Sequence, residues 1–238
     1  MRRAALYVHG RIVLGDSHLD AFQKLSQIEQ EESMASGWFD DTTEEFESDL
    51  PEDHFYNKEL LFVRHGECEE PQEPDSDLSD FGKEEVRKLA NVLLRSFDLK
   101  NLTGICSPML RCLETALILH ELLDVPFKVQ SDIIETPLFL DEGQQYRLQN
   151  HCDKFPQFNW DDMREQVLTK ETLPEFLART KIALQHFPHR CIVVAHYGFI
   201  YNATCLALCD TKAVQDIPPA SVTHIDKQNV RCVGWTTN

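Results

Sequence analysis

The sequence has few basic residues and no cluster of them. It contains 23 Lys and Arg against 40 Asp and Glu, which gives a formal net charge of −17. Proteins that bind duplex nucleic acid neutralise its phosphates with clustered Lys and Arg, and no comparable basic run is found here. We therefore expect no direct binding of nucleic acid.

Long apolar runs and paired cysteines are also missing. No stretch approaches the roughly 18 apolar residues that a membrane-spanning helix needs, and no sustained apolar segment follows the first residues, as it would in a secretory signal peptide. The eight cysteines lack the short paired spacing of a zinc site. Most lie in apolar segments, which is typical of buried thiols in a reducing compartment. These absences predict a cytoplasmic protein that makes no contact with membranes.

The first 57 residues differ in character from the rest. Between Glu29 and Asp53 there are many acidic residues, no Lys or Arg, and only scattered aromatic residues. Such a composition buries too little apolar surface to offset chain entropy. We therefore predict that residues 1–57 form an acidic, largely disordered extension ahead of a folded domain at 58–238. The extension is either a solvating tail, which we favour, or a segment that docks onto a protein partner.

From residue 59 onward, predicted strands and helices alternate. Their patterns predict strands at 60–63, 104–107, 127–130, 191–195, 221–225 and 230–235, and helices at 79–97, 109–123, 174–187 and 199–208. This alternation is typical of a three-layer α/β fold, in which helices cover both faces of a mostly parallel sheet. Residues 136–173 contain several helix breakers, and we predict an irregular segment that caps a site.

Two histidines stand at the exits of the central predicted strands. One apolar run leads into Arg64 and His65, and another ends immediately before His196. Ligands of open α/β sheets bind at the carboxyl ends of the strands, and helix starts, where Arg111 and His196 are predicted to lie, favour anions. We therefore predict that two imidazoles and two guanidinium groups converge on one phosphate. A neutral imidazole is a competent nucleophile, which suits phosphoryl transfer to histidine.

Four sequence blocks carry a family resemblance. Residues 61–67 (LFVRHGE), 78–82 (LSDFG), 107–116 (SPMLRCLETA) and 192–198 (IVVAHYG) resemble the blocks of the histidine phosphatase superfamily, also called the phosphoglycerate mutase-like family. The resemblance covers about residues 59–236. Within it, the stretches 106–116 and 128–135 (KVQSDIIE) are most similar to the phosphatase domain of the suppressor of T-cell receptor signalling proteins. It implies the phosphoglycerate mutase-like fold and phosphomonoester hydrolysis through a phosphohistidine, with no metal and no cofactor.

The resemblance also implies roles for single residues. His65 matches the phosphorylated nucleophile, and Glu135 matches the general acid. Arg64, Arg111 and His196 match the residues that hold the phosphoryl group, and His196 also counts as catalytic. Apart from the resemblance, Glu135 closes a predicted strand where the irregular segment begins. Partial burial there would raise the pKa of its carboxyl toward the value that an acid needs.

Two features depart from the family. Three residues after His65, where the family usually has Arg, Asn or another polar donor, this chain has Cys68. A thiol is a weak donor, and losing one charge-assisted donor costs on the order of 2 to 3 kcal/mol, which predicts reduced activity. A thiol made reactive by nearby positive charge is the other interpretation of Cys68. The segment after Glu135 also lacks the specificity pattern of the mutases, which disfavours mutase activity.

Alternatives to an active phosphatase stay open. Cys68 is compatible with a catalytically weak or inactive member that acts as a binding module, with the acidic extension as its docking arm. A metallohydrolase would instead hold a divalent ion between His65 and His196, with Glu67 and Glu69 as nominal ligands. For a phosphatase, the expected substrate is a phosphorylated protein or small molecule. The other eight histidines are expected at the surface or at helix ends.

Overall fold

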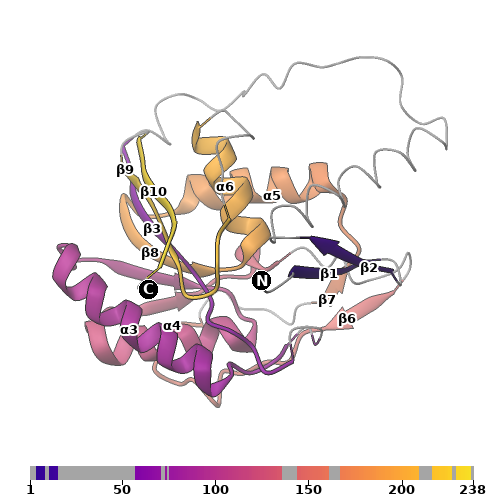
Figure 1. Ribbon diagram of the computed structural model, residues 1–238, viewed down its shortest axis with the longest axis horizontal. Helices are drawn as coiled ribbons and strands as arrows, with labels where there is room; N and C mark the ends of the chain where they lie inside the picture. The colour runs from indigo at the N-terminus through magenta and orange to yellow at the C-terminus, as the bar shows by residue number, and fades with distance from the viewer. Residues whose placement is uncertain are drawn as a thin grey trace.

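A six-stranded sheet forms the centre of the computed structural model, which describes residues 4–8, 11–15, 57–70, 73, 75–135, 144–160, 167–208, 216–226 and 229–236. The strand order is β10-β9-β3-β8-β4-β5 (Figure 1). The strands are β3 (Glu59–Arg64), β4 (Thr103–Cys106), β5 (Phe127–Val129), β8 (Arg190–Ala195), β9 (Val222–Asp226) and β10 (Asn229–Trp235). Strands β3, β8, β4 and β5 run parallel, and β9 and β10 are antiparallel additions at one edge. The predicted mostly parallel sheet is confirmed.

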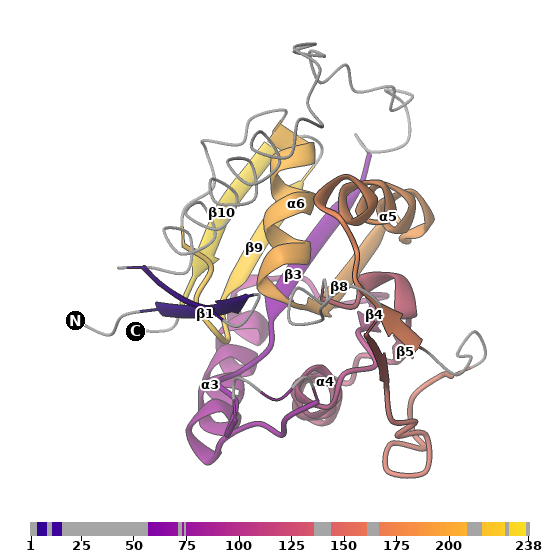
Figure 2. The ribbon, with the colours of Figure 1, turned by 90° about the vertical axis from the view of Figure 1, so that its right-hand side faces the viewer.

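Helices cover both faces of this sheet. Helices α3 (Asp80–Ser96) and α4 (Leu110–Leu123) lie on one face, and α5 (Leu173–His186) and α6 (Tyr197–Leu208) lie on the other (Figures 1 and 2). Side chains of β3 alternate between the layers, because Leu61 packs with α3 and α4 whereas Phe62 packs with α5 and α6. Burial on both faces explains why the central strands are continuously apolar. The predicted three-layer arrangement is confirmed.

The register of the two central strands places the two histidines side by side. Strand β3 pairs with β8 in parallel, and Arg64 lies opposite Ala195 at the carboxyl end. The next residue on each strand is a histidine, and the backbone N–H of His65 donates to the carbonyl of Ala195 at 3.1 Å. The sheet therefore delivers His65 and His196 to the same edge.

Lys58 ties the entry of β3 to the end of α5. Its Nζ donates to the carbonyl oxygens of Leu184 at 2.7 Å, Gln185 at 3.0 Å and Phe187 at 2.8 Å. These carbonyls lie at the C-terminal end of the helix, where intrahelical donors run out and a cation is favourable. The amine is buried, and burial lowers the pKa of Lys58. The sequence did not predict this contact, which joins residues more than 120 positions apart.

Two short antiparallel strand pairs occur where we expected irregular chain. In the predicted extension, β1 (Ala4–Val8) pairs with β2 (Arg11–Gly15) in antiparallel fashion. The acidic part of that extension lies outside the described residues, so its disorder and its docking role stay predictions. In the predicted cap, β6 (Gln145–Arg147) pairs with β7 (Val167–Thr169), while residues 136–143 and 161–166 lie outside the described part. The cap is therefore less irregular than predicted.

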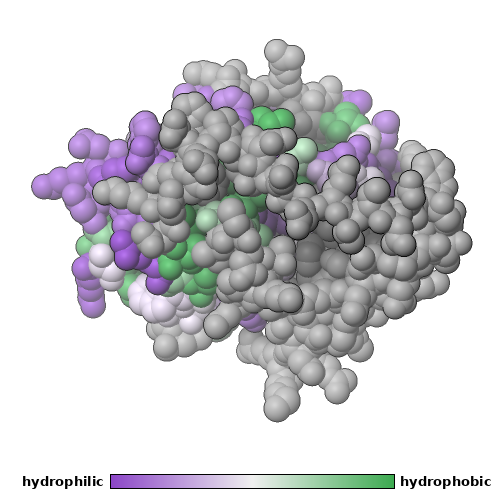
Figure 3. Space-filling model, turned by 90° about the horizontal axis from the view of Figure 1, so that it is seen from above, coloured by the Kyte–Doolittle hydropathy of each residue, from purple (hydrophilic) through white to green (hydrophobic). Residues whose placement is uncertain are grey.

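Exposed apolar side chains are spread over several elements. Seen from above, hydrophilic residues gather at the left of the molecule and hydrophobic residues show near the middle (Figure 3). The large exposed apolar residues in the described part are Phe81, Leu94, Leu122, Val167, Ile182 and Trp235. Such single exposures are normal for globular proteins. No described helix combines the length and the apolar character that crossing a bilayer would require.

Candidate active site

The structure brings both predicted histidines and Arg111 together at the carboxyl end of the sheet. The ring centroids of His65 and His196 lie 5.3 Å apart. The Nε of Arg111, in the first turn of α4, lies 3.2 Å from Nε2 of His65. Both imidazoles are buried, with 8% of His65 and none of His196 exposed. Three side chains from three separate segments thus meet at one point.

The contacts of His65 define its tautomer. Its Nδ1 lies 2.8 Å from the carbonyl oxygen of Gly66. Because a carbonyl can only accept, this contact assigns the proton to Nδ1 and leaves Nε2 unprotonated. Arg111 donates its Nε–H to Nε2. The carbonyl of the next residue, Gly66, therefore orients the His65 ring, and Nε2 of that ring faces the guanidinium of Arg111.

The loop after His65 is held by α4. The backbone N–H of Gly66 donates to Oγ1 of Thr115 at 3.2 Å, and that hydroxyl donates to the carbonyl of Arg111 at 2.8 Å. The block at 78–82 contributes through its backbone, since the N–H of Ser79 donates to the carbonyl of Glu67 at 2.9 Å. A Cβ on Gly82 would collide with the backbone of Glu67. The first turn of α3 therefore packs directly against this loop.

Arg64, the residue before His65, is a buried cation. Its Nη1 donates to the carbonyl of Ile217 at 2.6 Å, and its guanidinium lies over the Tyr197 ring at 5.4 Å from the centroid. Its Nε is buried and has no hydrogen-bond partner among the described residues. Burial lowers the pKa of Arg64, while the charges of Glu135 and Asp216 oppose this effect. Arg64 is thus a buried cation that can still donate a hydrogen bond.

His196 forms the floor of the site. Its Nε2 lies 2.8 Å from Oγ of Ser107 and 3.4 Å from Sγ of Cys112. Burial, followed by the positive charges of Arg111, His65 and Arg64, holds the pKa of His196 well below its ordinary value. The ring is therefore neutral at pH 7. Sequence reasoning did not assign Ser107, although it belongs to one of the four blocks.

Glu135 reaches the first turn of α6. Its Oε2 accepts a hydrogen bond from the backbone N–H of Gly198 at 3.0 Å. A Cβ on Gly198 would lie 2.5 Å from Oε1 of Glu135, so the close approach requires glycine at this position. Gly198, which binds the carboxyl, comes two residues after His196. The charge of the Glu135 carboxyl also acts on the pKa of Arg64. Glu135 therefore belongs to the same site.

Cys68 lies beside His65 as a neutral thiol. Its Sγ is 3.6 Å from Nδ1 of His65 and 3.8 Å from the carbonyl oxygen of Gly66. Burial raises the pKa of Cys68, although Arg111 and Arg64 act in the opposite direction. Burial thus opposes activation of the Cys68 thiol by the nearby cations, because desolvation is the larger effect.

A buried Asp75–His151 pair supports the start of α4. Nε2 of His151 lies 2.8 Å from Oδ2 of Asp75, and Oδ1 of Asp75 accepts from the backbone N–H of Leu110 at 2.7 Å. A carboxylate is favourable at a helix N-terminus. The expectation that the remaining histidines lie at the surface or at helix ends is wrong for His151, which is 6% exposed. The pair fixes the helix turn that carries Arg111, and no local sequence signal predicted it.

The carboxylates proposed for a metal site do not assemble one. Oε1 of Glu67 accepts from the hydroxyl of Ser79 at 3.4 Å, and Glu69 is exposed. Over the described residues, no group of three or more His, Cys, Asp or Glu is arranged to hold a metal ion.

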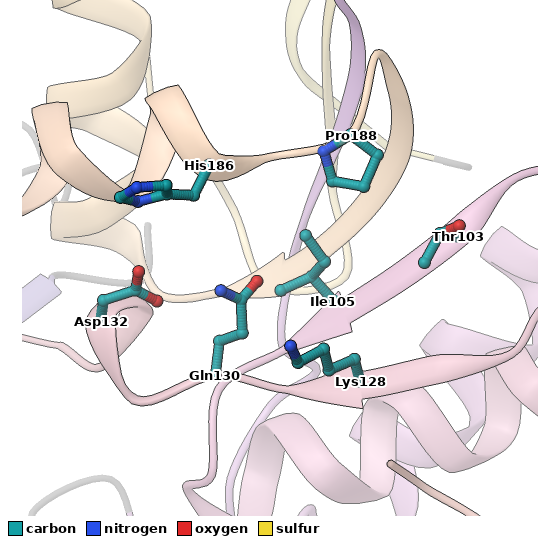
Figure 4. Close-up of a pocket in the computed structure, with 7 residues that line it drawn as sticks. All are labelled: Thr103, Ile105, Lys128, Gln130, Asp132, His186 and Pro188. Carbon is teal, nitrogen blue, oxygen red and sulfur yellow. The ribbon is translucent and has the colours of Figure 1, made fainter. Parts of the chain in front are cut away.

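A cavity of about 360 Å³ lies away from the two histidines. It opens between β4, β5 and the C-terminal end of α5 (Figure 4). The residues that line it are Thr103, Ile105, Lys128, Gln130, Asp132, His186 and Pro188. None of the predicted site residues contributes to its wall, so this cavity is distinct from the site around His65.

Comparisons with known proteins identify a family and a fold. The profile of the histidine phosphatase superfamily, branch 1, matches residues 60–236. A search of curated proteins found no match. A mycobacterial glucosyl-3-phosphoglycerate phosphatase in complex with inorganic phosphate has a similar structure, with 19% identity, a TM-score of 0.54, and coverage of 75% of this chain and 98% of that one. The product of an open reading frame of Mycobacterium tuberculosis shares 20% identity with a TM-score of 0.53, over 76% of this chain and all of that one.

These similar structures show the fold. The finer resemblance to the phosphatase domain of the suppressor of T-cell receptor signalling proteins stays a prediction.

Proposed function

Because the chain belongs to branch 1 of the histidine phosphatase superfamily, we propose that it hydrolyses phosphomonoesters through a phosphohistidine on His65. The observation that carries the proposal is the contact between Arg111 Nε and His65 Nε2 at 3.2 Å. It joins an unprotonated imidazole nitrogen to a guanidinium group, which are a nucleophile and an anion-binding group at one point. A phosphatase among the proteins that share the fold supports the proposal at the level of the reaction class.

In the first step, a substrate phosphoryl group replaces the contact between Arg111 and His65. Arg111 then donates to a phosphoryl oxygen, and the free Nε–H of Arg64 supplies a second cationic donor. The lone pair of His65 Nε2 attacks phosphorus and forms an N–P bond while the P–O bond to the alcohol breaks. Glu135 donates a proton to the leaving oxygen, so that a neutral alcohol departs.

In the second step, water takes the place of the alcohol. Glu135, now a carboxylate, removes a proton from the water, and the water oxygen attacks phosphorus while the N–P bond breaks. His65 recovers its lone pair, and inorganic phosphate is released. Fixed donors stabilise the charge on the equatorial oxygens in both steps. Two guanidinium groups provide this charge without a metal ion.

The neutral state of His196 suits this cycle. Arg64 and Arg111 already place two positive charges around the phosphoryl group, and their charges contribute to the low pKa of His196. A neutral imidazole can donate one hydrogen bond to a phosphoryl oxygen while its other nitrogen accepts from the Ser107 hydroxyl. We therefore propose that His196 orients the phosphoryl group and does not transfer protons.

A catalytically weak member that acts as a binding module is the second candidate function. The observation that favours it is Cys68, whose neutral thiol occupies a position next to His65 where the family usually has a stronger donor. A weak donor there leaves one phosphoryl oxygen poorly bound. The two candidates differ in whether hydrolysis depends on His65.

The test is hydrolysis of p-nitrophenyl phosphate between pH 5 and 7 with excess chelator. We expect turnover by the parent protein, inhibition by orthovanadate, and no turnover by His65→Ala, whose melting temperature serves as the folding control. Brief incubation with labelled substrate should trap acid-labile, alkali-stable phosphate on the parent alone. Equal background rates from both proteins would favour the binding module.

A further inference from the structure

Arg179 holds the backbone immediately before Glu135. Its Nη1 donates to the carbonyl oxygens of Asp132 at 2.8 Å and Ile134 at 2.9 Å. We propose that Arg179 is a positioning residue that sets the location of Glu135 for proton donation to the leaving group. The inference rests on the proposed function, in which Glu135 is the acid.

The guanidinium of Arg179 is itself fixed. Its Nε and Nη2 donate to the two carboxyl oxygens of Glu171 at 2.9 and 2.6 Å, and its Cζ lies 4.7 Å from the centroid of the Phe176 ring. A bidentate pair of this kind gives directional specificity that a lysine cannot reproduce. The remaining nitrogen, Nη1, is thus held in position to donate to the carbonyls of Asp132 and Ile134.

The carbonyl of Ile134 belongs to the peptide unit that begins Glu135. Fixing it therefore restricts the direction in which the Glu135 side chain leaves the backbone. The preceding turn, η1 (Ser131–Ile133), carries Asp132 beneath α5, as Figure 4 shows. Ile133 and Ile134 are buried in different apolar clusters, so packing fixes the side chains while Arg179 fixes the carbonyls.

Phe176 links this support to the other contact of Glu135. Its Cε1 would lie 3.2 Å from a Cβ on Gly198, the residue whose N–H binds the Glu135 carboxyl. Arg179, the Phe176 ring and the first turn of α6 therefore form a continuous layer behind the carboxyl. The low pKa of His196 arises mainly from burial, and the charge of Arg179 is the last of the smaller causes.

Arg190 provides a matched control. It donates to Glu59 at 2.6 Å and to the backbone carbonyls of Lys100 and Asp98 at 3.2 and 2.8 Å. This is the same combination of one carboxylate and two carbonyls. Arg190 begins β8, however, whereas the site lies at the end of that strand. Removal of Arg190 should affect stability without reaching Glu135.

The test compares two substrates whose leaving groups differ in their need for a proton. An alkoxide needs a proton as it departs, whereas p-nitrophenolate leaves without one, so only the alkyl substrate depends strongly on the acid. The quantity to measure is kcat/KM, because it reports the steps up to departure of the leaving group. For Arg179→Met, we expect kcat/KM for glycerol 2-phosphate to fall about 10- to 100-fold, part of the contribution of a general acid. For p-nitrophenyl phosphate, we expect less than about a threefold fall.

The comparison includes the parent protein, Arg179→Met, Arg179→Lys and Arg190→Met, with inhibition by orthovanadate measured for each. Vanadate inhibition should stay unchanged, because the anion-binding groups are not altered. Arg179→Lys should not restore kcat/KM for glycerol 2-phosphate to the value of the parent protein. Arg190→Met should leave the ratio of the two kcat/KM values at the parent value. If Arg179→Met does not fold, Glu171→Gln loosens the same guanidinium and should shift the ratio in the same direction.

Equal losses for both substrates, or an unchanged ratio in a folded variant, would overturn the role of Arg179 and leave the proposed function intact. Absence of any hydrolysis that depends on His65 in the parent protein would overturn the proposed function and this inference with it.

Discussion

Gly198→Ala should lower the catalytic rate much more than the stability, because it displaces the carboxyl of Glu135, the proposed general acid. The new Cβ would lie 2.5 Å from Oε1 of Glu135 and 3.3 Å from its Cδ. Non-bonded atoms of this kind settle near 3.5 Å, so the carboxyl must withdraw by about 1 Å. It then loses the hydrogen bond from the Gly198 N–H, which is 3.0 Å long in the native protein. A misplacement of about 1 Å can cost on the order of 100-fold in rate.

The effect on stability should be small by comparison. A hydrogen bond to a charged group contributes about 1.5 to 3 kcal/mol, while replacing glycine by alanine within a helix returns about 1 kcal/mol. We therefore expect Gly198→Ala to lose no more than about 2 kcal/mol of unfolding free energy. The rate with an alkyl phosphate should nevertheless fall about 100-fold.

A double-mutant cycle supplies the decisive comparison. Glu135→Gln removes the acid and keeps the shape of the side chain, so Gly198→Ala should have almost no further effect in that background. The assay is kcat/KM for glycerol 2-phosphate, with urea unfolding of all four proteins as the control. Independent, multiplicative effects of the two substitutions would refute the reasoning, as would parent-level activity of Gly198→Ala.

Three further results are expected. Cys68→Asn should raise kcat/KM for p-nitrophenyl phosphate, by roughly tenfold or more if the amide replaces a missing donor; a matched Cys68→Ala variant should not show this gain. Lys58→Met should lower the unfolding free energy by about 2 to 3 kcal/mol, measured by urea titration, because three helix-end carbonyls lose a cationic donor. His196 binds its proton less readily when folded than when unfolded, so stability should decline as the pH falls below about 6.5, at up to about 1.4 kcal/mol per pH unit. A His196→Asn variant should show a weaker decline over the same range, and identical pH profiles would contradict that assignment.

Local patterns were sufficient to predict the main elements. Apolar runs at 60–63 and 191–195 correspond to β3 (Glu59–Arg64) and β8 (Arg190–Ala195), because a strand buried on both faces leaves an uninterrupted apolar signal. The N-terminal cap of α3 is also a local feature, since Ser79 Oγ accepts from the N–H of Gly82 at 2.9 Å. The antiparallel pair of β6 and β7 was missed because three-residue strands carry too little periodicity.

The positions of the candidate site residues were predictable where these residues follow strands or begin helices. The side chains that hold them in place were not predictable from the sequence. His65 and His196 each follow an apolar run, which is visible in the sequence. The Asp75–His151 pair joins residues 76 positions apart, and Arg179 binds the carbonyls of Asp132 and Ile134, which lie 47 and 45 positions away. Burial of a polar side chain with its partner depends on tertiary packing and leaves no periodic signal. The groups that hold the site in place therefore emerge only from the structure.

The strand order has a consequence for how the protein is made. Strand β3 is the first of the central sheet in sequence, yet its two neighbours are β8 and β9, which come near the end. During synthesis from the N-terminus, Arg64 and His65 emerge long before the strands that will flank them. A nascent or prematurely terminated chain that lacks residues 190–226 carries His65, the proposed nucleophile, without the strands that flank it. The pocket around His65 can therefore assemble only after the segment that contains β8 and β9 has been synthesised.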